Sequence, residues 1–190
     1  ACRKDGSEFP ISIKTSELFL EGKRFFTAIT ADISERRELM DRLEHLAEHD
    51  PLTGLYNRRY FLDELSRIQE RIHRGSLQCA LLFIDLDNFK YVNDTMGHPA
   101  GDKVLLDISE LLKQRLRAGD LLARQGGDEF TILLYDINKK EAFDIAEDYR
   151  KQIANYQFQA EDQTVDIGGS IGLALMNNAE SDSISPLAQA

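Results

Sequence analysis

Cysteine is scarce in this sequence, which argues against a fold held together by disulfides. The 190 residues include two cysteines, Cys2 and Cys79, and these lie far apart in the chain. A disulfide framework or a cysteine-based metal site needs thiols at closer and more regular spacing. Cys79 also lies in an apolar run. We therefore expect two reduced thiols, as is typical of a cytoplasmic protein.

Positive charge is in the minority. The sequence has 23 Lys and Arg residues against 33 Asp and Glu residues, a formal net charge of -10. Such a balance repels a phosphate backbone and argues against nucleic acid as a partner. A small anionic ligand would need the help of a metal ion.

Long apolar runs are also missing. No stretch approaches the ~20 residues that a membrane-spanning helix needs, and the N-terminal residues lack a signal-peptide pattern. We therefore expect a cytoplasmic location, and any membrane anchor would have to lie in regions outside this chain. A chain of 190 residues has room for one catalytic domain and an appendage.

Residues 1–33 contain short segments in which apolar and polar residues alternate, as they do in strands. The alternation runs from Phe9 to Lys14 and from Phe25 to Ile33, with a short apolar piece, Leu18 to Leu20, between them. Three short strands cannot bury a core by themselves. The stretch from Arg3 to Pro10, followed by a second alternating strand, resembles the closing strands of a PAS sensor domain. The resemblance implies that residues 1–33 are the C-terminal part of such a sensor and that most of its ligand pocket lies outside this sequence.

Residues 34–49 are rich in charge and predict a helix. Leu39, Leu43 and Leu46 recur four and three residues apart, which places them on one stripe of a helix that Asp32 would cap. Two interpretations stay open: a coiled-coil seam, or a solvated helix that packs this stripe on its own domain. A PAS domain followed by such a helix resembles a common signal-transmitting arrangement, which would make residues 34–49 a signalling linker.

The rest of the chain alternates between helix and strand patterns. Amphipathic helices are interleaved with a continuous apolar strand, a hairpin around a Gly-Gly pair and a strand interrupted by glycine. This order predicts an α+β fold with helices over a mixed sheet. The expected elements are a helix from Phe61 to Ile72 closed by Gly75, a strand from Cys79 to Ile84, a helix that starts near Pro99, a hairpin of Leu121 to Arg124 and Phe130 to Tyr135, a helix from Ala142 to Ile153, and a strand from Val165 to Leu175.

The predicted hairpin carries two adjacent carboxylates. Asp128 and Glu129 directly follow Gly126 and Gly127. Glycines at a turn let a ligand approach the backbone closely, and the carboxylates offer that ligand hard oxygen donors. Taken alone, Gly-Gly-Asp is also ordinary turn chemistry.

A second acidic segment makes a metal site the better interpretation. Asp85 directly follows the apolar strand, and an ionised carboxylate there is costly unless it is paired or binds a metal. If Asp85 and Asp128 lie at neighbouring strand ends, they would form an oxygen-rich Mg²⁺ site with positions open for substrate phosphates. For Asp87 we favour the simpler role of a helix cap or loop residue.

Three ordered motifs resemble those of the GGDEF family of diguanylate cyclase domains. They are DPLTGLYNRR at residues 50–59, the D-x-D-x-F-K-x-x-N-D and G-H-x-x-G-D patterns within residues 85–102, and GGDEF at residues 126–130. Three motifs in matching order are far more specific than one pentapeptide. The resemblance implies a ferredoxin-like sheet, similar to nucleotidyl cyclase and polymerase palm domains. It assigns residues 50–190 to a GGDEF domain that is C-terminally truncated, since the family normally continues with a helix and a strand.

The resemblance implies an enzyme that condenses two GTP molecules into cyclic di-GMP and two pyrophosphates, as a homodimer. Its cofactor would be Mg²⁺ or Mn²⁺, held by Asp85, the Leu86 carbonyl and Asp128. Glu129 would be either a further ligand or the base that accepts the proton of the attacking hydroxyl.

The same resemblance assigns the substrate-binding residues. Asn93 and Asp102 would accept hydrogen bonds from the N–H donors of guanine, although each could instead cap a turn or a helix. Lys90 would contact phosphate, with a solvated loop charge as the simpler alternative. Phe89, Gly126 and Gly127 complete the predicted substrate site.

Arg117 and Asp120 match the R-x-x-D site at which such enzymes bind their own product. Arginine can fork onto guanine or phosphate acceptors, and aspartate can accept the donors of guanine. A charge at a helix end is the simpler interpretation of Arg117. The spacing of nine residues to Gly126 favours the product site.

Two other functions compete with the enzyme. One is a non-catalytic receptor for GTP or cyclic di-GMP that regulates a neighbouring domain, and the intact Asp85, Asp128 and Glu129 argue against it. The other is a dimerisation module, in which the leucine stripe of residues 34–49 matters more than any chemistry. Turnover of GTP would distinguish the three.

Overall fold

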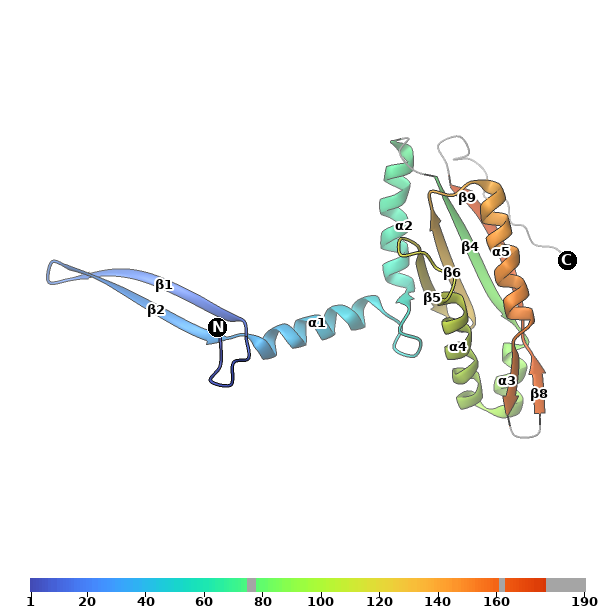
Figure 1. The fold of residues 1–190 in the computed structure, drawn as a ribbon, viewed down its shortest axis with the longest axis horizontal. Coiled ribbons are helices and arrows are strands. Elements are labelled where there is room, and N and C mark those ends of the chain that lie inside the picture. Colours follow the sequence, from blue (N-terminus) through green and yellow to red (C-terminus); the bar gives the residue numbers. More distant parts are fainter. Residues whose placement is uncertain (75–77, 161–162, 177–190) are drawn as a thin grey trace. The chain divides into compact units, whose positions relative to one another are not determined.

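A computed structural model describes residues 1–74, 78–160 and 163–176, and the chain divides into two compact units. The first unit is Ala1–Ala47, and the second begins at Glu48. Figure 1 shows the ribbon of each unit, coloured along the sequence.

The first unit contains a long β-hairpin. Strands β1 (Ile11–Leu20) and β2 (Lys23–Asp32) pair antiparallel over their whole length. The loop between them consists of Glu21 and Gly22, whose φ angles are both positive, 50° and 76°. Two positive φ angles in a two-residue loop match the twist of the flanking strands.

This hairpin corrects the predicted division of residues 1–33. The sequence predicts a separate apolar piece from Leu18 to Leu20, but these residues form the end of β1, where Leu18 pairs with Phe25. Ahead of the hairpin, an isolated bridge joins Cys2 and Glu8. The assignment of residues 1–33 to a PAS domain stays a prediction.

Helix α1 (Ser34–Glu48) follows the hairpin directly. The Asp32 carboxylate accepts hydrogen bonds from the Ser34 backbone nitrogen at 2.9 Å and from its hydroxyl at 2.6 Å. One of the free N–H groups at the helix start is thereby satisfied. None of the side chains described in this unit is buried. The leucine stripe of α1 is exposed too, since Leu43 retains 62% of its accessible surface.

The second unit is built on a mixed sheet of five described strands. Their order is β3-β5-β6-β4-β9; β3 and β5 pair parallel, and the other neighbours pair antiparallel. A small separate hairpin, β7–β8, precedes the last strand. The elements are β3 (Tyr56–Asn57), α2 (Arg58–His73), β4 (Cys79–Asp87), α3 (Phe89–Met96), α4 (His98–Lys113), β5 (Leu121–Gly126), β6 (Glu129–Tyr135), α5 (Lys139–Ala154), β7 (Gln157–Ala160), β8 (Gln163–Asp166) and β9 (Gly168–Met176).

Helices cover both faces of this sheet. Figure 1 shows α2 and α5 on opposite sides of the strands. Phe61 and Ile68 of α2 pack on Leu81 and its neighbours, while α3, α4 and α5 pack on the face that carries Leu82 and Ile84. The first four residues of β4, Cys79 to Leu82, therefore alternate between two hydrophobic clusters, as expected where a strand is covered on both faces.

The predicted α+β fold with a mixed sheet is confirmed, with four differences in its elements. Helix α3 and strand β7 were not expected, strand β3 is too short to be recognised, and the strand predicted from Val165 to Leu175 is two strands that separate at Ile167. Gly75, the predicted end of the second helix, lies outside the described residues. Among the described helices, none combines the length and the apolar character needed to cross a bilayer.

Candidate active site

Strand β4 and the β5–β6 hairpin bring three acidic residues together. Asp85, near the end of β4, pairs directly with Glu129, the first residue of β6. Asp128 immediately precedes Glu129 in the turn of the hairpin. The fold thus gathers the three predicted carboxylates at one end of the sheet.

Two glycines shape this turn. Gly126 has a φ of 137° and Gly127 a φ of 55°, both in the region that residues with a side chain rarely adopt. The pairing of β5 with β6 shifts register between Arg124 and Gly126, as at a β-bulge. The glycines therefore allow the bend that leads into Asp128.

The three carboxylates form a negative cluster. Burial raises the pKa of Asp85, and the negative charges of Asp128, Glu129 and Asp87 raise it further. A cation relieves repulsion of this kind, and Mg²⁺ prefers carboxylate and carbonyl oxygens. Within the described residues, no three His, Cys, Asp or Glu side chains converge as a complete metal site. An ion at Asp85 and Asp128 would therefore need further oxygen ligands besides these side chains.

Asp87 and Asn88 join β4 to the elements around it. Asp87 accepts a hydrogen bond from the Ser170 hydroxyl at 3.1 Å, and a Cβ on Gly168 would lie only 2.7 Å from Asp87 Oδ2. Asn88 has a left-handed φ of 66° and donates to the Asp166 carbonyl at 3.3 Å. Asp87 is thus the last residue of β4 and contacts β9, so it is neither a helix cap nor a loop residue, and Asn88 occupies the position before α3.

Helices α3 and α4 carry the two predicted guanine-binding residues. Asn93 is half-buried on α3, and Asp102 is exposed on α4. Gly101 is buried so close to Asn93 that a Cβ on it would overlap the Asn93 amide. Asp102 does not cap α4, because the residue before that helix is Gly97. In the described part of the chain no hydrogen bond engages either side chain, so both are available to a ligand.

Phe89 and Lys90 begin α3 but have different surroundings. The Lys90 side chain is exposed, as a phosphate contact requires. Phe89 is 8% exposed and belongs to the core cluster that includes Leu86 and Val92. The Phe89 side chain therefore helps to form the core, and a contact of Phe89 with substrate stays a prediction.

Comparison with known proteins identifies the second unit. A family model described as "Diguanylate cyclase, GGDEF domain" matches residues 47–190, most of the chain. This chain belongs to the GGDEF family. The fold described above is that of a GGDEF domain.

Individual relatives and solved structures agree. DgcE of Escherichia coli K12, named a probable diguanylate cyclase, is 35% identical over all of this chain, and the diguanylate cyclase DgcM of that organism is 38% identical over 79% of it. The chain spans 17% and 37% of the lengths of these relatives. Among solved structures, the coiled coil and GGDEF domain of DgcB from Caulobacter crescentus, in complex with c-di-GMP, has a TM-score of 0.72. It is 28% identical, and the match covers 78% of this chain and 80% of that one.

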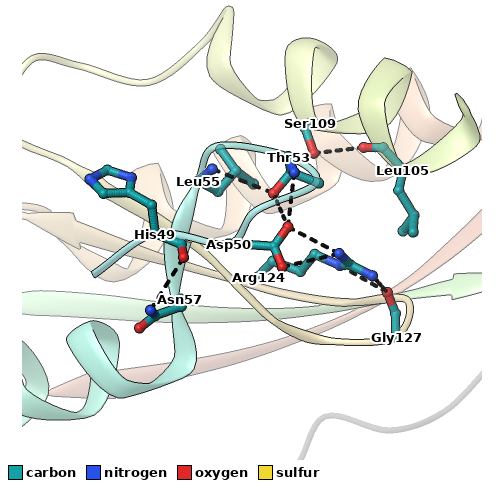
Figure 2. Close-up of polar contacts among 9 residues, drawn as sticks. All are labelled: His49, Asp50, Thr53, Leu55, Asn57, Leu105, Ser109, Arg124 and Gly127. Carbon is teal, nitrogen blue, oxygen red and sulfur yellow. Dashed lines mark hydrogen bonds and ion pairs between the residues drawn. The ribbon is translucent and has the colours of Figure 1, made fainter. Parts of the chain in front are cut away.

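Sequence reasoning missed two residues of this GGDEF domain, Asp50 and Arg124. Figure 2 shows the Arg124 guanidinium between the Asp50 carboxylate and the Gly127 carbonyl. Nη1 of Arg124 donates to both Asp50 oxygens, at 3.0 and 3.2 Å, while Nε and Nη2 donate to the Gly127 oxygen at 3.0 and 2.8 Å. Asp50 opens the first motif, and Arg124 stands two residues before Gly126, so their places in the motifs were the available signal.

The predicted product site lies in the loop after α4. The Asp120 carboxylate accepts hydrogen bonds from the backbone nitrogens of Arg117 at 3.1 Å and Tyr135 at 3.3 Å. The Arg117 side chain is exposed, and it does not end the helix, because α4 stops at Lys113. Asp120 therefore shapes this loop of the GGDEF domain, and each of its oxygens keeps a lone pair for a further donor.

Proposed function

We propose that this GGDEF domain condenses two GTP molecules into cyclic di-GMP and two pyrophosphates, working as a homodimer. The proposal rests on the cross-strand pair of Asp85 and Glu129 with Asp128 beside it, all three intact in a chain of this family. The relatives named diguanylate cyclase support the same reaction for this chain. Two domains are needed because each GTP must serve once as nucleophile and once as electrophile.

The reaction consists of two equivalent phosphoryl transfers. In each, the 3′-hydroxyl oxygen of one GTP forms a bond to the α-phosphorus of the other. The bond from that phosphorus to the oxygen bridging the α- and β-phosphates breaks, pyrophosphate leaves, and the hydroxyl proton passes to a base. Mg²⁺ or Mn²⁺, when held by Asp85, the Leu86 carbonyl and Asp128, lowers the pKa of the hydroxyl and neutralises the developing charge.

Glu129 has two roles open to it. Its exposed side chain, directly across from Asp85, suits either a further metal ligand or the base. A Glu129→Gln variant separates these roles. Loss of the base would remove the acidic limb of the pH–rate profile, whereas loss of a ligand would raise the Mg²⁺ concentration needed for half-maximal rate.

Asn93 and Asp102 would select guanine. Their unengaged acceptor oxygens match the N–H donors on the guanine edge, and ATP would leave these polar groups unpaired. Such a mismatch reduces turnover by up to ~10⁴-fold in a site built around hydrogen bonds. Comparable turnover of ATP and GTP would contradict this assignment.

Arg117 and Asp120 would bind cyclic di-GMP as a feedback inhibitor. The exposed Arg117 guanidinium offers a forked donor, and Asp120 has lone pairs to spare. An Arg117→Ala variant should need roughly 10- to 100-fold more cyclic di-GMP for half inhibition, as expected when one charged hydrogen-bond set of about 1.5–3 kcal/mol is lost. Initial rates should change little, and equal sensitivity in both proteins would rule the site out.

The decisive experiment measures cyclic di-GMP formed from GTP and Mg²⁺ by the full chain and by the protein that contains it. Asp85→Asn or Asp128→Asn should abolish synthesis while preserving the fold, because a neutral amide cannot offset the charge of the ion and the triphosphate. Asp144→Asn, which removes the same charge from an exposed position on α5, is the control and should stay active. Near-normal synthesis by either active-site variant would overturn the metal assignment, and GTP binding without synthesis by the unmodified protein would favour a receptor.

A further inference from the structure

The Arg124 guanidinium uses all three of its nitrogens to join two segments. One nitrogen reaches both oxygens of Asp50, and the other two converge on the Gly127 carbonyl. The side chains of Arg124 and Asp50 are only 12% and 18% exposed. A forked, partly buried pair of this kind is stronger and better defined than a surface ion pair.

Arg124 acts from the face of the sheet opposite to Asp85 and Glu129. In the ladder, Arg124 pairs with Phe130, whose ring is buried in the cluster beneath α4 and α5, whereas Glu129 pairs with Asp85. Neighbouring residues of a strand point to opposite faces. The guanidinium therefore does not share the face of the reacting groups, and it meets the turn only through the backbone of Gly127.

The turn needs an external restraint. Gly126 and Gly127 lack side chains and adopt positive φ angles, so the backbone there has unusual freedom. Beyond them, Asp128 and Glu129 carry like charges beside Asp85, which repel one another. Two N–H donors of Arg124 hold the Gly127 carbonyl, which restricts the backbone of the residue immediately before Asp128.

Asp50 in turn fixes the direction of the guanidinium. The Thr53 backbone nitrogen and hydroxyl donate to Asp50 Oδ1 at 2.9 and 2.7 Å, which locks the carboxylate in a turn. Burial opposes the ionisation of Asp50, but the hydrogen bonds of Thr53 and Arg124 outweigh it and hold its pKa below the usual value. Asp50 is thus charged at neutral pH, where it forms an ion pair with Arg124.

We propose that Arg124 is a positioning residue: Asp50 orients its guanidinium, and the guanidinium fixes the Gly127 carbonyl so that Asp128 and Glu129 are presented toward Asp85. The kinetic part of this inference rests on the proposed diguanylate cyclase activity. The geometric part, that Arg124 restrains the Gly127 carbonyl from the opposite face of the sheet, does not depend on that activity.

The test compares Arg124→Lys and Asp50→Asn with a matched control in the full chain. Lysine keeps the charge but has one nitrogen, so it cannot place two nitrogens on the Gly127 carbonyl while a third reaches Asp50. Asparagine keeps an oxygen for Thr53 but loses the ion pair. The control is Asp148→Asn, which breaks the cross-element pair of Arg115 and Asp148 (2.6 Å) elsewhere on the domain.

We expect Arg124→Lys and Asp50→Asn each to lower kcat by about 10- to 100-fold, which is the effect of misplacing reacting groups by up to ~1 Å. The KM for GTP should change less than about threefold, because Asn93 and Asp102 are untouched. Amide hydrogen exchange should accelerate at residues 126–129 and stay unchanged in β4. Combining Arg124→Lys with Asp50→Asn should cost no more than either alone, because both break one unit.

Three results would overturn the inference: an unchanged kcat, a loss of kcat that Asp148→Asn reproduces, or exchange that accelerates across the whole domain as general destabilisation would cause. If neither the unmodified chain nor a longer protein that contains it makes cyclic di-GMP, the proposed function is refuted, and the positioning role is not. The positioning role is then decided by hydrogen exchange alone, with faster exchange confined to residues 126–129 supporting it and unchanged exchange there refuting it.

Discussion

Both units of this chain contain antiparallel strand pairs, but the strands are exposed in the first unit and largely buried in the second. Strands β1 and β2 pair over ten residues each, yet every residue of β2 is exposed. Strand β4 pairs on both sides, and six of its nine residues are buried between helices. A regular ladder therefore does not by itself make a core, which requires a further layer on at least one face.

The side chains of the hairpin show why the difference is not one of composition. Glu17 pairs with Phe26 and Leu18 with Phe25, so the two phenylalanines point to opposite faces of the hairpin. Both are large and exposed, at 72% and 45%. Each face of this hairpin therefore carries a large exposed aromatic side chain. The assignment of residues 1–33 to a PAS sensor domain stays a prediction.

The sharpest test of the comparison exchanges one isoleucine in each unit for alanine. Ile132 is 0% exposed and Ile29 is 71% exposed. Ile132→Ala should lower the free energy of unfolding by ~2–5 kcal/mol, because it leaves a cavity in the core. Ile29→Ala should change it by less than about 0.5 kcal/mol.

Urea unfolding followed by far-ultraviolet circular dichroism measures both changes. The two variants remove the same atoms from strands of the same chain, so each is the control for the other. A large loss of stability in Ile29→Ala would mean that the hairpin is covered in solution and that the contrast is false.

The two cysteines give a second test. Cys79 is 1% exposed, and burial raises its pKa to about 11, while Cys2 is exposed. Only the thiolate reacts with iodoacetamide, so at pH 8 Cys2 should be alkylated at least ~100-fold faster than Cys79. Mass spectrometry of peptides from timed samples measures both rates, and urea should remove the difference. Equal rates in the native protein would show that β4 opens readily.

The smallest expected effect concerns the cost of the acidic cluster. The folded pKa of Asp85 is raised, so its ionisation destabilises the fold as pH rises above the value in the unfolded chain, about 3.9. In EDTA at pH 7, Asp85→Asn should therefore raise the melting temperature by about 1–2 °C, since exposed charges interact by only a few tenths of a kcal/mol.

This gain should shrink as the pH is lowered into the acidic range in which Asp85 takes up a proton in the unmodified chain. Asp144→Asn removes a charge outside the cluster and should give no such gain. A melting temperature that falls in Asp85→Asn at pH 7 would mean that the carboxylate is stabilising and that the cluster is not repulsive.

The sequence predicts those parts of the fold that depend on local periodicity. The amphipathic patterns of α2, α4 and α5 and the apolar run of β4 indicate these elements because one face or the whole strand is buried. Helix α3 has eight residues and starts after a left-handed Asn88, so it is too short for a period and lacks a side-chain cap. Strand β3 is two residues long and exists through its pairing with β5, which no local pattern encodes.

Some residues of the candidate site can likewise be recognised in the sequence, and others cannot. Asp85, Asp128 and Glu129 are recognisable because a charge at the end of an apolar strand, or beside paired glycines, needs a reason. Asp50 and Arg124 lie 74 residues apart, and each alone is an ordinary surface charge in the sequence. Their importance comes from a contact that forms only in the folded chain.

That 74-residue separation also bears on the order in which the parts of the domain fold. The β5–β6 hairpin is local and can form within ~1–10 μs, whereas the Asp50–Arg124 contact must first close a long loop. The hairpin and its final turn geometry therefore need not appear together. If the domain has the proposed activity, cyclic di-GMP would form only after the Asp50–Arg124 contact is made. Spectroscopic signals from strand pairing would appear earlier.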